Sequence, residues 1–127
     1  MVDAPPDPLR GDPPVTTGRA DSARLSDILR SVERLEEVFR AGFDQFAASW
    51  LSQSAVVREL EIIGEAAGHL SAGLRGKHPE IAWAKMRGFS SFAKHEYWKI
   101  DPGLVWRAVA EMPTVKDKLT RVVASLG

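Results

Sequence analysis

The chain has 127 residues, 44% of them hydrophobic, and its 17 basic and 17 acidic residues give a formal net charge of zero. This length predicts one domain with a single hydrophobic core. The absence of cysteine excludes disulfides and thiolate metal sites, and the three histidines show no metal-ligand spacing, so we expect neither a metal nor another cofactor. No apolar run is long enough for a membrane span, and no signal peptide is evident, so we expect a cytoplasmic protein without a membrane partner.

The first twenty residues differ in composition from the rest of the chain. They hold five of the eight prolines and two glycines. Such a segment cannot bury enough apolar surface to offset the entropy lost on ordering, so residues 1–20 are predicted to be a disordered tail. A helical domain is then expected to span residues 21–127.

The first predicted helix follows the tail. Its apolar residues recur at steps of three and four, which is typical of one buried helical face. These residues are Leu25, Ile28, Leu29, Val32, Leu35, Val38 and Phe39. Asp21 or Ser22 is the expected N-cap, and Gly42 is expected to mark the end of the helix or a bend.

A second helix is expected to start between residues 46 and 54 and to carry an apolar stripe as far as Leu70. Gly64 falls in its middle, at a cost of about 1 kcal/mol relative to alanine, for which a close approach by another helix would compensate. Arg58, Glu61 and Glu65 form a polar row on one side, which we interpret as surface ion pairing within the helix.

Three further features complete the predicted fold. Residues 75–83 ("RGKHPEIAW") are expected to be a loop, and a helix is expected from Trp83 to about Lys94. Asp101 and Pro102 suit the N-cap and first position of another helix, which Pro113 should kink or interrupt. Because no segment alternates polar and apolar residues, we predict an all-α fold, an antiparallel bundle of four to five helices.

The stretch "RGFSSFAKHEYWKID" begins at Arg87 and carries the candidate chemistry. On a helix Arg87, Ser91 and His95 share one face, since they lie four residues apart. Histidine can move a proton near neutral pH and arginine can stabilise charge on a phosphate, which suffices for metal-free RNA cleavage by internal transfer. The alternative is structural, because a histidine near a helix C-terminus interacts favourably with the helix dipole.

Charge is unevenly distributed along the chain. Residues 75–107 contain seven basic and three acidic residues, a local excess of four positive charges, while the remainder carries a net charge of minus four. A basic surface around the motif would attract an anion, and Lys85, Lys94 and Lys99 are our candidates for contacting RNA phosphate. A solvated face with scattered lysines is the alternative.

The sequence resembles the HepT-like branch of the HEPN superfamily. "VVRELEIIGEAAGHLS" is similar to the second helix of that family, and "HPEIAWAKMRGF" and "HEYWKIDPGLVW" are similar to the segment around its active site. The resemblance implies a small all-α RNase toxin that forms a homodimer, with its two motifs facing each other across the interface. It also implies a partner, an MntA-like nucleotidyltransferase antitoxin that transfers AMP from ATP to the motif tyrosine.

The family signature is an arginine, four residues of any kind, a histidine, any residue and a tyrosine, and the arginine is usually followed by asparagine. His95 and Tyr97 match it, and Tyr97, the only tyrosine in the chain, would be the modified residue. Ser90 and Ser91 stand where arginine and asparagine are expected. Arg87 matches a different family position, just before the motif.

Three explanations of the substitution remain open. The protein is a degenerate toxin with weak or no activity, Arg87 serves in place of the missing arginine, or the motif was altered so that a toxic protein could be produced. Two functions follow: an RNase toxin with its antitoxin, or a non-catalytic helical dimer that keeps only the antitoxin contact. Ser90 and Ser91 favour the second function. The retained His95 and Tyr97 and the basic surroundings favour the first.

Overall fold

A computed structural model describes residues 17–94 and 101–126 of the chain, and its regular secondary structure in these ranges is helical. The elements are α1 (Thr17–Ala41), α2 (Phe43–Ala48), α3 (Trp50–Gly68), α4 (Ala72–Lys77), α5 (Trp83–Lys94), α6 (Pro102–Ala110) and α7 (Met112–Ser125). The predicted all-α class is confirmed. Seven helices stand in the described ranges where four to five were expected, since the two short helices α2 and α4 join longer ones.

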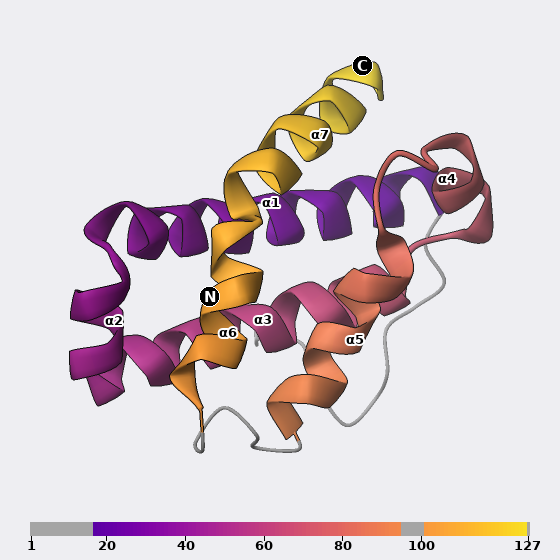
Figure 1. The fold of residues 1–127 in the computed structure, drawn as a ribbon. Coiled ribbons are helices and arrows are strands. Elements are labelled where there is room, and N and C mark those ends of the chain that lie inside the picture. The colour runs from indigo at the N-terminus through magenta and orange to yellow at the C-terminus, as the bar shows by residue number, and fades with distance from the viewer. Residues whose placement is uncertain (1–16, 95–100, 127) are drawn as a thin grey trace, which may run out of the picture.

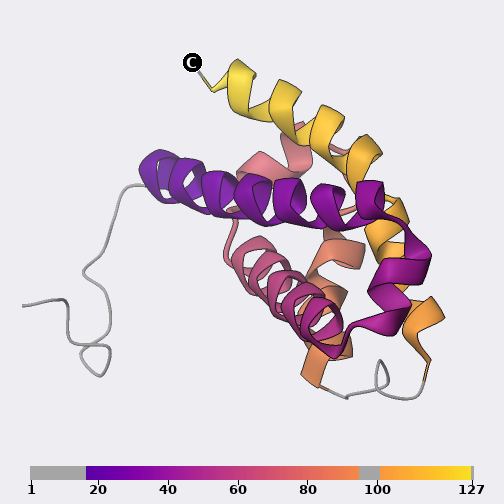
Figure 2. The same cartoon turned by 90° about the vertical axis from the view of Figure 1, so that its left-hand side faces the viewer.

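The two longest helices, α1 and α3, run antiparallel and are joined at one end by α2 (Figure 1). The other main helix pairs are α5 against α3 and α7 against α1. In Figure 1 the α6 and α7 ribbons form one column that crosses α1, and Figure 2 shows α7 lying beside α1. The antiparallel arrangement therefore applies to α1 and α3, and the later helices cover this pair.

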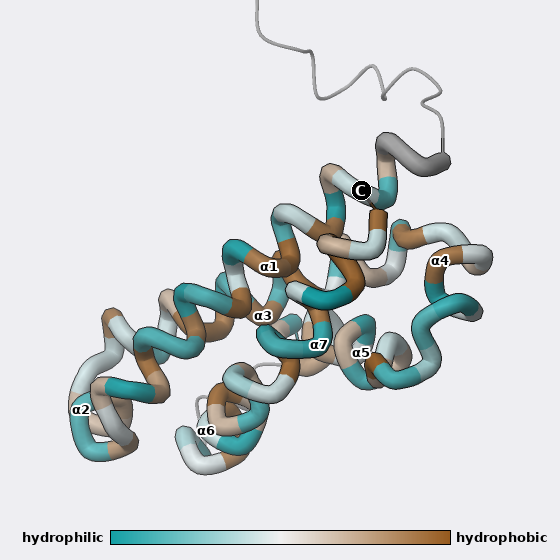
Figure 3. Tube along the Cα trace, turned by 90° about the horizontal axis from the view of Figure 1, so that it is seen from above, coloured by the Kyte–Doolittle hydropathy of each residue, from teal (hydrophilic) through white to brown (hydrophobic). Residues whose placement is uncertain are grey.

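The predicted apolar stripes form the core between these helices. Along the tubes of Figure 3, hydrophobic positions recur at intervals with hydrophilic ones between them. Residues with 1% or less of their surface exposed come from α1, α2, α3, α6 and α7: Leu25, Ile28, Val32, Leu35, Phe46, Val56, Leu60, Ile63, Ala67, Val105, Val109, Met112, Leu119 and Val122. Burial of one face of each helix provides the main driving force for this arrangement.

The predicted start of the first helix was wrong. Helix α1 begins at Thr17, so Asp21 and Ser22 lie inside it and neither is its N-cap. Asp21 is buried instead, and its carboxylate accepts hydrogen bonds from the backbone N–H of Ser71 (2.9 Å) and from the Ser71 hydroxyl (2.5 Å). Asp21 therefore ties α1 to the start of α4, through a partner 50 residues away that helical periodicity cannot indicate.

Most of the predicted helix boundaries are confirmed. Gly42, at φ 98°, separates α1 from α2 in a backbone conformation that favours glycine. Asp101 caps α6 by accepting a hydrogen bond from the N–H of Gly103 at 2.9 Å, and the α6 helix ends before Pro113. The predicted loop over residues 75–83 is partly wrong, because α4 extends to Lys77 and the non-helical connection is limited to residues 78–82.

Candidate functional site

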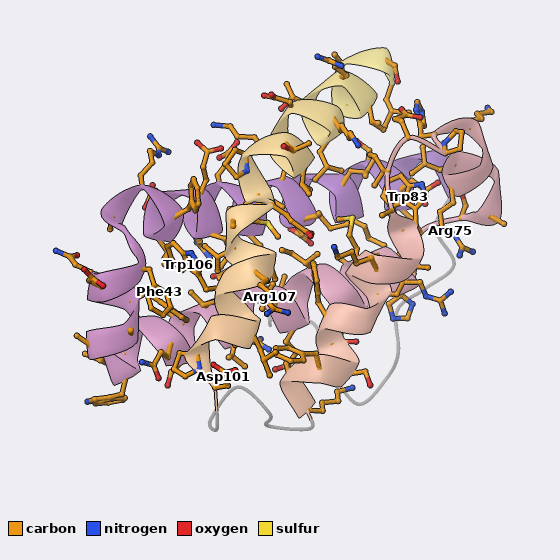
Figure 4. The ribbon with its side chains drawn as sticks, viewed as in Figure 1. Phe43, Arg75, Trp83, Asp101, Trp106 and Arg107 are labelled. Carbon is orange, nitrogen blue, oxygen red and sulfur yellow. The ribbon has the colours of Figure 1, made fainter. Side chains whose placement is uncertain are left out.

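Helix α5 carries the part of the motif that the structure describes. Trp83, Met86, Phe89 and Ala93 are buried, at steps of three and four residues. Figure 4 shows Trp83 at the start of α5, near α4, and its indole N–H donates to the carbonyl of His78 at 2.9 Å. The exposed residues of α5 include Lys85, Arg87, Ser91 and Lys94.

Ser90 lies where α5 packs tightly against α3 at Gly64. A Cβ built on Gly64 would stand 2.4 Å from the backbone nitrogen of Ser90 and 2.8 Å from its Cβ, which is closer than real atoms approach. Gly64 therefore allows backbone-to-backbone contact within one chain, and this contact offsets its low helix propensity. The Ser90 hydroxyl donates to the carbonyl of Arg87 at 3.1 Å.

A hollow of about 460 Å³ opens beside this contact, between α3 and α5. Its lining residues are small or polar: Gly64, Glu65, Gly68, His69, Ala84, Arg87, Gly88 and Ser90. Its volume falls within the range of about 300–1,000 Å³ that is typical of small-molecule sites. The position at which the family signature has arginine thus lies on the wall of an open, polar hollow.

Three side chains with polar or charged ends border this hollow. Within the described residues, no hydrogen bond or ion pair involves the Glu65 carboxylate, the His69 imidazole or the Arg87 guanidinium. The side chain of Arg87 extends across to α3, since its Nε lies 3.9 Å from the Cβ position of Gly68. Arg87 and Ser90 therefore share one hollow, with the guanidinium turned toward α3.

A second hollow, of about 440 Å³, lies on the other side of α5, against α6. Phe89, Phe92 and Leu104 give it an apolar lining, with Lys85 and Arg107 among its polar residues. Figure 4 shows the Arg107 side chain on the side of α6 that faces α5. Lys85 forms an ion pair with Glu111 of the link between α6 and α7, so the structure places Lys85 and Arg87 in different hollows.

The remaining predicted site residues are only partly covered by the structure. Lys94 is exposed at the last position of α5. His95, Tyr97 and Lys99 lie in residues 95–100, outside the described residues. The candidate site is therefore built here from α3 and α5 alone.

A separate pair of ionisable residues precedes α5. His78 Nδ1 lies 3.1 Å from a carboxylate oxygen of Glu80. The pKa of the Glu80 carboxyl is lowered, mainly because the backbone N–H of Glu80 itself donates a hydrogen bond to it. Desolvation opposes this effect, and His78 and Lys118 add to it. Neither His78 nor Glu80 lines the hollow beside Ser90.

Residues 17–94 and 101–126 contain no group of three or more His, Asp or Glu side chains arranged to hold a metal ion. None of the helices in these ranges is both long and apolar enough to cross a membrane.

Sequence reasoning missed two residues of the hollow. The predicted ion-paired row is only partly confirmed, because Arg58 pairs with Glu61 at 3.3 Å and Glu65 stays unpaired among the described residues. His69 was considered only as a possible metal ligand. Gly64 and Gly68, four residues apart on one face beside Glu65 and His69, were the available signal for a helix face that another element approaches closely.

Comparisons with known proteins agree with this picture of the chain. The family model "Ribonuclease HepT-like" matches residues 28–122. A probable ribonuclease HepT of Thermococcus cleftensis is 34% identical over 106 residues, which make up 82% of this chain and 96% of that protein. A putative RNase of Methanocaldococcus jannaschii is 34% identical over 99 residues, 76% of this chain and 91% of that protein.

A putative RNase of Caldanaerobacter subterraneus is 31% identical over 101 residues, which cover 78% of this chain and 90% of that protein. No solved structure gives a significant match. The matched residues include α3 and the whole motif, which begins within α5 and ends just before α6. The chain therefore belongs to the HepT-like ribonuclease family.

Proposed function

We propose that this chain is the toxin subunit of a HepT/MntA-type toxin–antitoxin pair, an RNase of the HEPN type that needs no metal. The observation that carries the proposal is the position of residue 90, on a polar hollow between α3 and α5, within a chain that the family model matches over residues 28–122. In the proposed reaction the RNA 2′-hydroxyl attacks the neighbouring phosphate, the P–O5′ bond breaks, and the products are a 2′,3′-cyclic phosphate and a free 5′-hydroxyl. His95 takes the proton from the 2′-hydroxyl or gives one to the leaving 5′-oxygen, and water carries the other proton. A fixed positive charge stabilises the phosphate as its negative charge grows.

We propose that the RNase activity of the unaltered chain is weak, because the fixed positive charge is missing at Ser90. The Ser90 hydroxyl donates to the Arg87 carbonyl and carries no charge of its own. Loss of one well-placed donor in a transition state costs about 3–4 kcal/mol, or a factor of about 100–1,000 in rate. Arg87 borders the same hollow but extends across Gly68, so we propose that it replaces the missing arginine only in part.

Cleavage of one RNA by four proteins tests this proposal. The unaltered chain should cleave the RNA slowly, and the Ser90→Arg variant should cleave it faster. The double variant Ser90→Arg with His95→Ala should not cleave it at all. The hollow beside Ser90 has room for the longer side chain. Rapid cleavage by the unaltered chain that Arg87→Ala abolishes would show instead that Arg87 has taken over the role.

We also propose that the chain acts as a homodimer and is silenced by a nucleotidyltransferase antitoxin that places AMP on Tyr97. Gly64 gives no support to the dimer, because Ser90 of the same chain already occupies the space that it leaves. Family membership supports it. Light scattering at micromolar concentration should give twice the chain mass, and a monomer would contradict the proposal.

A non-catalytic helical dimer that keeps only the antitoxin contact is the second candidate. The uncharged Ser90, already hydrogen-bonded within its own helix, favours it. If neither the unaltered chain nor Ser90→Arg with Ser91→Asn cleaves RNA, while the dimer and the antitoxin complex both form, this second function is the correct one.

A further inference from the structure

We propose that the hollow between α3 and α5 binds one phosphate of the RNA strand between Arg87 and His69, and that Glu65 weakens this binding. The inference rests on the proposed function, since it identifies how the substrate is held at the same site. It adds Glu65 of α3 and the C-cap residue His69, both outside the motif, to the residues that border the RNA. Arg87 and His69 line the same hollow although 18 residues separate them in sequence.

The donors of this hollow are available to a ligand. Both Arg87 and His69 are exposed, and no hydrogen bond or ion pair of the described residues involves either side chain. An arginine guanidinium presents a fork of N–H donors that matches phosphate geometry, and a protonated imidazole adds another donor. Lys85, by contrast, already pairs with Glu111 in the other hollow.

The small residues of the hollow give a phosphate access to these donors. Gly64, Gly68, Ala84 and Gly88 project at most a methyl group into a volume of about 460 Å³. That volume accommodates a phosphate together with its sugar. Position 90, where the family signature has arginine, borders the same space. A strand held in the hollow would therefore also lie next to position 90.

The same geometry admits a structural role for both residues. His69 is the C-cap of α3, and Arg87 reaches over Gly68, so both side chains also lie near the carbonyl end of that helix. Glu65 distinguishes phosphate binding from a purely structural role, because it lies one helical turn before His69 and lines the hollow. If RNA phosphate binds in the hollow, the negative charge of Glu65 weakens RNA binding. If RNA does not enter the hollow, Glu65 has no effect on RNA binding.

Binding to a fluorescent twelve-nucleotide RNA with 2′-O-methyl sugars measures this site without cleavage. Arg87→Gln should weaken binding about tenfold, as for loss of one charge-assisted hydrogen bond, and should lower the slope of log K against log salt by about 0.7. His69→Gln should weaken binding by a smaller factor, and His69→Lys should restore it. Glu65→Gln should tighten binding.

Arg121→Gln and His78→Gln are the matched controls. Arg121 is exposed on α7, and neither it nor His78 lines the hollow, so both variants should bind as the unaltered chain does. Inorganic phosphate and a DNA strand of the same sequence serve as competitors. If DNA at the same concentration displaces the RNA, the site recognises the phosphate backbone, as proposed. If the protein binds millimolar inorganic phosphate but neither RNA nor DNA, the assignment to RNA is overturned.

Equal binding by Arg87→Gln, His69→Gln and the unaltered chain overturns the inference but leaves the proposed RNase intact. An absence of cleavage overturns the RNase and leaves the inference standing if the binding pattern holds. Tighter binding of an acidic peptide than of RNA, with the same dependence on Arg87, would assign the hollow to a protein partner instead.

Discussion

Replacement of Gly64 by alanine tests the close contact between α3 and α5. The added methyl would lie 2.4, 2.8 and 3.0 Å from the nitrogen, Cβ and Cα of Ser90, and two of these atoms are backbone that no rotamer change can move. Overpacking of this kind costs about 1–3 kcal/mol, and the rigid neighbour favours the upper value. Alanine recovers about 1 kcal/mol of helix propensity. We expect a net loss of about 2 kcal/mol in the free energy of unfolding.

Thermal and urea unfolding, followed by circular dichroism, measure this loss. For a domain of about 100 residues it corresponds to a fall of roughly 10 °C in Tm. Gly88→Ala is the matched control, because it also lies within a helix but a Cβ there meets nothing within 4 Å. Gly88→Ala should be neutral or more stable. If Gly64→Ala unfolds at the same temperature as Gly88→Ala, the close contact between α3 and α5 is refuted.

Three further changes have defined outcomes. Asp21→Ala should lower the free energy of unfolding by about 1.5–3 kcal/mol in urea titrations, because it removes a charged acceptor from two hydrogen bonds with Ser71, and an unchanged midpoint would contradict that tie. NMR titration should give Glu80 a pKa below its usual value of 4.5. The Glu80 carboxylate then stabilises the fold at pH values above its unfolded pKa, and this stabilisation is lost as the pH falls through its folded pKa. Glu80→Gln should therefore reduce the dependence of the free energy of unfolding on pH in this acidic range. Incubation with the antitoxin and ATP should add AMP to the chain by mass spectrometry, and Tyr97→Phe should prevent it; AMP found on that variant would exclude Tyr97 as the acceptor.

Much of the fold could be predicted from the sequence, because the signals are local. A helical stripe depends only on apolar residues at steps of three and four, and the burial of Leu25, Ile28 and Leu35 confirms the first one. The helix start at Asp101 and the bend at Gly42 were predicted for the same reason, since a cap and a positive φ each depend on one residue and its neighbours.

Parts of the candidate site were also determined by sequence alone. The sequence alone shows that two serines stand in place of arginine and asparagine. It also shows that the histidine and the tyrosine of the signature are retained at the correct spacing. The geometry of helix α5 could be anticipated too, because Arg87 and Ser91, one turn apart, must share a face, and both are exposed.

Only the tertiary structure decided which distant residues meet. Asp21 bonds to Ser71 rather than to its own helix end, and Gly64 meets Ser90 within the chain rather than a second copy. The hollow joins His69 to Arg87 for the same reason. Periodicity determines which face of a helix is buried, but the partner of that face depends on how whole helices pack, and many residues contribute to that choice at once.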